Sequence, residues 1–157
     1  MAFGVGFTPD GLELFKAYVR KHFPTAPEVM YNVDFIWDYK EPNLGSHILE
    51  IAKHKDLWGQ GVKEPLVVIK GVPVTSKEFL LMGKGTLKIL IPRTKISCIK
   101  FGYGEELYEQ TNQYFQSADT VIKMDIIGRC AENNFNGIAP QIEIEDFQIS
   151  STHSWYF

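Results

Sequence analysis

The feature that most constrains the fold of this chain is a pair of alternating segments near its C-terminus, residues 121–131 and 141–149. The first segment places apolar or small side chains on one face and charged ones on the other. A period of two is typical of a half-buried strand. The second segment alternates in the same way until Asp146, where a shift of phase predicts a β-bulge. Asn136 and Gly137, between the segments, tolerate positive φ, so we expect a long hairpin that closes a larger sheet.

The segments upstream supply strands for that sheet. Short β-type runs occupy residues 66–74, 79–82, 86–91 and 96–101, and one helical run follows at 104–116. We interpret 79–82 and 86–91 as halves of one strand that bends around the intervening glycines. The order is then three strands, one helix and two strands, as in an OB-fold, a five-stranded, partly open Greek-key barrel. The predicted fold class is mainly β: an OB-fold barrel preceded by a small α/β segment.

The first 57 residues predict that α/β segment. A short strand is expected at residues 2–7, and the helix start signal Thr8-Pro9-Asp10 precedes apolar residues spaced three and four apart. A strand is expected at 30–39, followed by a helix capped by Ser46. The sequence therefore predicts three parts: an N-terminal α/β segment at 1–57, an OB domain at 58–150 and a tail at 151–157.

Composition excludes several classes of protein. A chain of 157 residues with 45% hydrophobic and 22% charged residues is globular rather than disordered. It has no apolar run near the ~20 residues that a membrane helix needs, and its first residues do not form a signal peptide. Cys98 and Cys130 lie in β-type runs and are expected to be buried, reduced thiols. We therefore expect a cytoplasmic protein with no membrane partner.

Charge is unevenly distributed along the chain. Residues 76–103 contain six basic side chains and one acidic side chain, Glu78, although the formal net charge of the whole chain is −3. In the expected OB-fold these residues form the strands that bind oligonucleotides, and nearby aromatic rings could stack on bases. The lysines could equally serve to keep exposed strand edges soluble. The candidate nucleic-acid-binding residues are Lys84, Lys88, Arg93, Lys95, Lys100, Phe101, Tyr103, Arg129, Asn133, Phe135 and Asn136.

The titratable residues do not predict a catalytic or metal site. The four histidines, His22, His47, His54 and His153, show no i,i+4 pair of the kind that a metal-binding helix presents. The acidic residues of the hairpin are better explained as a solvated strand face. No serine or cysteine has the sequence context of a nucleophile elbow. We therefore predict no catalytic residues and no metal ligands.

Three local patterns occur in a fixed order along residues 55–149. They are Trp58-Gly59-Gln60-Gly61 with Pro65, Leu87-Lys88 followed by Ile99-Lys100-Phe101-Gly102, and Asn133-Asn134-Phe135-Asn136-Gly137 with Pro140-Gln141-Ile142 and Ile144-Glu145-Asp146. Their order and spacing resemble the C-terminal part of RecJ-type single-strand-specific DNA exonucleases, of the DHH phosphoesterase superfamily. The resemblance implies an OB domain that binds single-stranded DNA, with a role in DNA repair and recombination.

The resemblance also has implications for catalysis. In that family a Gly-Gly-His segment closes the catalytic cleft, and Asp- and His-rich motifs bind two metal ions, Mn²⁺ or Mg²⁺. This sequence matches only the end of the first segment, at Ala2 and Gly4, and contains none of the metal-binding motifs. Residues 8–23 would then correspond to the last helix of the DHH-associated domain. The resemblance implies that the chain is no enzyme on its own, and that cofactor metals belong to a catalytic domain that it lacks.

Two functions of different classes follow. The leading hypothesis is a non-catalytic OB module that binds single-stranded DNA. The alternative is a protein-interaction module that docks onto a catalytic DHH-domain chain or a replication protein through its acidic hairpin. Separately, the apolar stripe of Leu12, Phe15 and Val19 is expected to pack against residues 30–55 or a second copy of the chain, so self-association is a further expectation.

Overall fold

A computed structural model divides the chain into two compact units, residues 1–31 and residues 32–157. It describes residues 6, 8–22, 30–59, 61–135 and 137–153, with only the backbone at 152 and 153. The strand expected at 2–7 therefore lies, apart from Gly6, outside the described residues, as does the end of the predicted tail. The predicted domain boundary after residue 57 stays a prediction.

The first unit contains α1 (Pro9–His22), which confirms the predicted helix. The backbone N–H of Gly11 donates to the Thr8 hydroxyl at 3.2 Å, the capping contact that a threonine before a helix supplies. None of the residues of α1 is buried, and Leu12, Leu14 and Tyr18 are among its exposed side chains. What the apolar stripe of this helix packs against stays a prediction.

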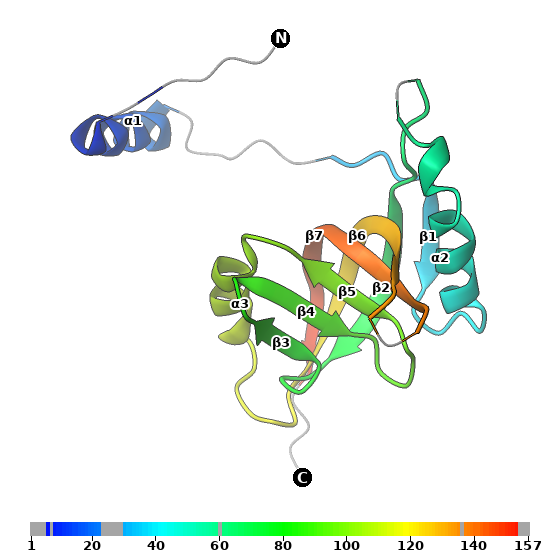
Figure 1. Cartoon of the computed structure of the whole chain (residues 1–157). Helices are drawn as coiled ribbons and strands as arrows, with labels where there is room; N and C mark the ends of the chain where they lie inside the picture. Colours follow the sequence, from blue (N-terminus) through cyan, green and yellow to red (C-terminus); the bar gives the residue numbers. More distant parts are fainter. Residues whose placement is uncertain (1–5, 7, 23–29, 60, 136, 154–157) are drawn as a thin grey trace. The chain divides into compact units, whose positions relative to one another are not determined.

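The second unit is built on one seven-stranded sheet with the order β1-β2-β6-β7-β5-β4-β3 (Figure 1). The pairs β1–β2 and β5–β7 are parallel, and the other pairs are antiparallel. This architecture confirms the mainly β class and is consistent with an OB-like fold. The strands are β1 (Phe35–Asp38), β2 (Val67–Val74), β3 (Phe79–Met82), β4 (Thr86–Leu90), β5 (Ser97–Lys100), β6 (Val121–Asn133) and β7 (Ala139–His153).

The β6–β7 hairpin confirms the interpretation of the C-terminal segments. The predicted apolar face of β6 is buried at Ile122, Met124, Ile126, Gly128 and Cys130. The predicted bulge is present, because Ile127 pairs with Asp146 while Gly128 pairs with Ile144, which leaves Glu145 without a partner in the ladder. Gly137 in the loop has a φ of 96°, whereas Asn136 lies outside the described residues.

The prediction that residues 79–82 and 86–91 form one bent strand is wrong. Phe79 pairs with Ile89 and Met82 with Thr86, so β3 and β4 form an antiparallel hairpin. Lys84 and Gly85 adopt φ values of 63° and 64°, which allow the chain to reverse within three residues. The range expected to form five strands therefore contains six, β2 to β7.

Three helical segments accompany the sheet. The first is α2 (Leu44–Ala52), the second a 3-10 turn, η1 (Lys55–Leu57), and the third α3 (Gly104–Asn112). The prediction that Ser46 caps α2 is wrong, because the helix begins earlier, directly after Asn43. Leu44 and Ile48 are both buried, so the apolar face of the helix includes its first residue. Helix α3 lies between β5 and β6 in the sequence, as predicted, and ends four residues early.

The two helices cover different parts of the sheet. Helix α2 packs against β6 and β7, and α3 packs against β3 and β4 (Figure 1). Phe79 of β3 is fully buried, with its ring centroid 5.4 Å from that of Tyr108 and 5.6 Å from that of Phe115. Within the described part of the chain no helix is long and apolar enough to cross a membrane.

Candidate nucleic-acid interface

One face of the sheet carries a groove over β4, β5 and β7. Leu87 and Ile89 of β4 are fully buried in the core, so Lys88 between them points to the opposite face. Lys88 pairs with Ile99 of β5, and Ser97 of β5 pairs with Gln141 of β7, so these side chains share that face. The groove has a volume of about 520 Å³ and is lined by Met82, Gly83, Thr86, Lys88, Ile99, Phe101, Glu132, Asn133, Asn134, Phe135 and Gln141.

Two aromatic rings on the groove are open to solvent. Phe101, directly after β5, is 62% exposed, and Phe135, in the β6–β7 loop, is 88% exposed. The side-chain oxygen of Asn133 accepts a hydrogen bond from the Phe135 backbone N–H at 3.0 Å, which fixes the start of this loop. Burying either ring against the protein would be favourable, so exposed rings on a hollow surface suit a planar apolar ligand.

A second, basic hollow adjoins this groove and shares Lys88 and Asn133 with it. It lies at the β4–β5 turn, which contributes the exposed side chains of Arg93 and Lys95. Its acidic residue, Glu78, already accepts hydrogen bonds from the backbone N–H and the hydroxyl of Thr75. The hollow therefore gathers three cations and one carboxylate, and one oxygen of that carboxylate already accepts both hydrogen bonds from Thr75.

Four of the predicted cationic residues have no acidic partner in the described part of the chain. Lys84, Lys88, Arg93 and Lys95 make no ion pair and no side-chain hydrogen bond with any described residue. Lys84 lies on the β3–β4 turn, next to Gly83 of the groove. These charges are therefore available to an anionic ligand.

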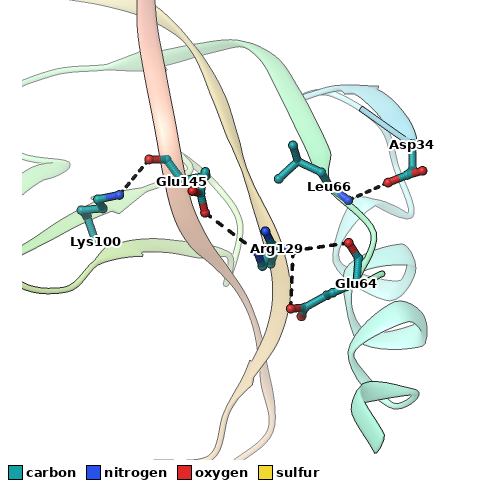
Figure 2. Close-up of polar contacts among 6 residues, drawn as sticks. All are labelled: Asp34, Glu64, Leu66, Lys100, Arg129 and Glu145. Atoms are coloured by element: carbon teal, nitrogen blue, oxygen red, sulfur yellow. Dashed lines mark hydrogen bonds and ion pairs between the residues drawn. The ribbon is translucent and has the colours of Figure 1, made fainter. Parts of the chain in front are cut away.

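The other two predicted cations are engaged elsewhere in the fold, as Figure 2 shows. The Lys100 Nζ donates to the backbone oxygen of Glu145 at 2.7 Å. A guanidinium nitrogen of Arg129 lies 3.3 Å from the Glu64 backbone oxygen and 3.7 Å from its carboxylate, and Arg129 Nε lies 3.9 Å from the Glu145 carboxylate. Arg129 lines a different hollow, together with Asp34, Trp58 and Glu64.

The RecJ OB domain family model matches residues 40–146. The chain belongs to the RecJ OB domain family. It is 29% identical over 127 residues to the proposed SPbeta prophage-derived single-strand DNA-specific exonuclease YorK of Bacillus subtilis (strain 168), and equally to the YorK protein of Bacillus phage SPbeta. The matched residues are 80% of this chain and 21% of each relative, so the chain spans about a fifth of their length.

Two of the RecJ-like sequence patterns meet at the groove. The two pieces of the second pattern are register partners, because Lys88 pairs with Ile99 and Leu87 with Lys100. The third pattern supplies Asn133, Phe135 and Gln141 from the hairpin. Of the remaining predicted residues, Tyr103 is exposed just before α3 and is not on the groove wall, and Asn136 lies outside the described residues.

Several groove residues were not among the binding residues predicted from the sequence. They are Met82, Gly83, Thr86, Ile99, Glu132, Asn134 and Gln141. Gln141 alternates with Ile142 along β7, so its place on the outer face could be predicted, but its low exposure of 9% could not. Its burial depends on β5, which flanks it on one side and comes from a distant part of the sequence.

The ionisable groups of the described residues do not indicate catalysis. Burial raises the pKa of Cys98 to about 12, and burial with the nearby charge of Glu64 raises the pKa of Cys130 to about 12. Both thiols are free and buried, as predicted, and such thiols are poor nucleophiles. No group of three or more His, Cys, Asp or Glu among the described residues is arranged to hold a metal ion.

Proposed function

We propose that this RecJ OB domain is a module that binds single-stranded DNA in the groove over β4, β5 and β7. The observation that supports it is the combination of two exposed rings on the groove with four cations, in the groove, beside it and in the adjoining basic hollow, that have no acidic partner among the described residues. Nucleic acids without fixed secondary structure are bound by basic grooves in which aromatic rings stack on successive bases. The name of the YorK relatives, which specifies single-strand DNA, favours DNA over RNA.

The distribution of charge suggests a path for the strand. Arg93 and Lys95 attract phosphates in the basic hollow, and Lys88 continues the positive surface into the groove. On the same face, Glu143 lies between Ile99 of the groove and Arg129. The carboxylates of Glu64 and Glu145 form ion pairs with Arg129 and neutralise its charge. A phosphate backbone would therefore follow β4 and its turns, and end before Arg129.

A finer description of the fold supports this assignment. We interpret β2 and β3, which are separated by only four residues, as one interrupted first strand of an OB-fold. One half pairs with β6 and the other with β4, and the parallel β5–β7 pair completes a five-stranded Greek-key arrangement. On this interpretation the groove lies over the second and third strands, the usual oligonucleotide-binding face of such barrels.

We propose that the module itself does not catalyse strand cleavage. In a RecJ-type exonuclease the metal ions and the nucleophilic water would be held by a DHH domain, and this OB module would hold the DNA beside it. Action in DNA repair or recombination, and a location in the cytoplasm, are parts of the same proposal.

Fluorescence anisotropy with a labelled oligo-dT at several salt concentrations tests the proposal. Lys88→Ala should weaken binding and flatten the slope of log affinity against log salt by ~0.7, the value for one lost phosphate contact on a single strand. Lys123→Ala is the matched control, because Lys123 is exposed on β6 and far along the strand from Asn133. Absence of binding by the unmodified protein at low salt would rule the proposal out.

One observation favours the protein-interaction alternative. The hollow at Arg129 has a volume of about 610 Å³ and brings Asp34 and Glu64 beside a half-buried Trp58. This surface does not suit phosphates, but a basic side chain of a catalytic DHH-domain chain or a replication protein would fit it. Glu64→Lys should then abolish association with such a partner while leaving oligo-dT binding unchanged.

A further inference from the structure

Gln141 is a buried polar residue on the floor of the groove. It is 9% exposed, and its backbone is fixed on both sides by pairing with Ser97 of β5 and Ala131 of β6. Its side chain nevertheless lines the groove together with Ile99 and the two aromatic rings. The side chain is therefore anchored on the sheet rather than on a loop.

The carboxamide has no hydrogen-bond partner among the described residues. In the same part of the chain, no fully buried side-chain nitrogen or oxygen lacks a partner. The polar atoms of Gln141 must therefore be reachable from the groove. A largely buried amide without a partner is destabilising, so a ligand that supplies both a donor and an acceptor is favoured at this place.

The chemistry of the groove floor favours a base over a phosphate. A phosphate oxygen can accept from the amide N–H₂ but leaves the amide oxygen without a donor. Glu132, the acidic residue on the groove wall, would also repel a phosphate. The Watson–Crick edge of every nucleobase, in contrast, presents a donor and an acceptor side by side, which match the two ends of a carboxamide.

We propose that Gln141, on the groove floor between Phe101 and Phe135, hydrogen-bonds the edge of a nucleobase that enters the groove. This inference rests on the proposed function and names the part of the nucleic acid that the groove reads. Rotation of the amide by half a turn exchanges its donor and acceptor, so each of the four bases can be accommodated. The contact therefore requires a base but does not select among bases.

The test compares two ligands and two proteins. The ligands are oligo-dT and an oligonucleotide of equal length in which the central nucleotides are abasic, and the proteins are the unmodified chain and Gln141→Met. Methionine keeps the length of the side chain and removes its donor and acceptor. Unmodified protein should bind oligo-dT more tightly than the abasic strand. Gln141→Met should weaken oligo-dT binding by about 5- to 100-fold, leave abasic binding unchanged and keep the salt slope.

Three other outcomes would contradict the inference, and they show whether the Gln141 contact, base recognition or nucleic-acid binding as a whole has failed. Equal affinity of Gln141→Met and unmodified protein for oligo-dT removes the role of Gln141 and leaves the proposed function standing. Equal affinity of the unmodified protein for both ligands removes base recognition and leaves phosphate binding standing. No binding of either ligand at low salt overturns both proposals.

A second measurement does not depend on the variant being folded. The side-chain N–H₂ signals of Gln141 in the unmodified protein can be followed by NMR during titration with the two ligands. A shift with oligo-dT and none with the abasic strand supports the base contact. Signals that stay in place with oligo-dT, while backbone signals of β4 and β5 move, contradict it.

Discussion

The Nζ of Lys100, the last residue of β5, donates a hydrogen bond to the backbone oxygen of Glu145 at 2.7 Å (Figure 2). Glu145 is the extra residue of the bulge in β7, so its carbonyl has no place in the regular ladder. The pairing of β5 with β7 ends at Ile99 and Glu143, and the lysine spans the point where the strands part. This cation therefore already has an acceptor in the free protein.

Lys100→Ala should consequently behave differently from Lys88→Ala. The Lys100 variant should lower the free energy of unfolding and change oligo-dT affinity little, because its ammonium is occupied by a carbonyl at the bulge. The Lys88 variant should do the reverse. Urea unfolding and anisotropy on the same preparations measure both effects. A larger loss of affinity from Lys100→Ala than from Lys88→Ala would show that the lysine leaves the bulge to meet DNA.

Phe135→Ala should reduce binding without reducing stability. The ring is 88% exposed, so its removal leaves no cavity and little lost packing. Loss of one stacked base would cost ~1–3 kcal/mol of binding free energy, with the salt slope unchanged because no phosphate contact is lost. Ile138→Ala, in the same loop and also exposed, is the control because Ile138 does not line the groove. Equal affinity losses from the two variants would assign the effect to the loop rather than to stacking.

The sequence predicted those parts of the fold in which local pattern and burial agree. The alternation along residues 121–131 is a property of one strand, and it gave the buried face of β6 correctly. The phase shift at Asp146 likewise located the bulge at Glu145 from the sequence alone. Both features depend on neighbours along the chain, and not on which strand lies alongside.

The parts that could not be predicted depend on pairing between distant segments. Two β-type runs separated by Gly83, Lys84 and Gly85 are compatible with a bend or a reversal, and only the partner strand decides between them. The predicted site shows the same limit. Lys88 and Lys100 were both predicted to bind nucleic acid because of their charge. Their register partners, Ile99 in β5 and Leu87 in β4, place them on opposite faces of the sheet. Residue type alone could not distinguish a groove residue from one that stabilises the bulge.

Gly128→Ala should destabilise the hairpin strongly. A Cβ at this position would collide with the backbone oxygen of Glu143 and with the Ile142 side chain, next to the bulge. Neither β6 nor β7 can move far, since both lie inside the sheet. We expect a loss of about 3 kcal/mol in the free energy of unfolding, as overpacking in a sheet interior costs. Gly59→Ala, where an added Cβ meets nothing within 4 Å and φ is not positive, should be nearly neutral in the same urea titration.

The two cysteines make a prediction about pH. Cys98 and Cys130 both pair with Ile142, from opposite sides, so they lie two strand spacings apart, about 9.6 Å. That separation is too large for a disulfide without movement of the backbone. The thiols therefore stay free, and burial raises the pKa of each from an ordinary value of 9.0 to about 12.

Above pH 9 the unfolded chain loses these two protons while the folded chain keeps them. Stability should then fall as pH rises from 9 to 12, by about 1.4 kcal/mol per pH unit for each thiol. Urea unfolding between pH 8 and 11 should show a steeper decline for the unmodified protein than for Cys98→Ala/Cys130→Ala. Lysine and tyrosine titration is common to both proteins and cancels in the difference. Parallel stability curves would mean that water or hydroxide reaches the thiols in the folded sheet.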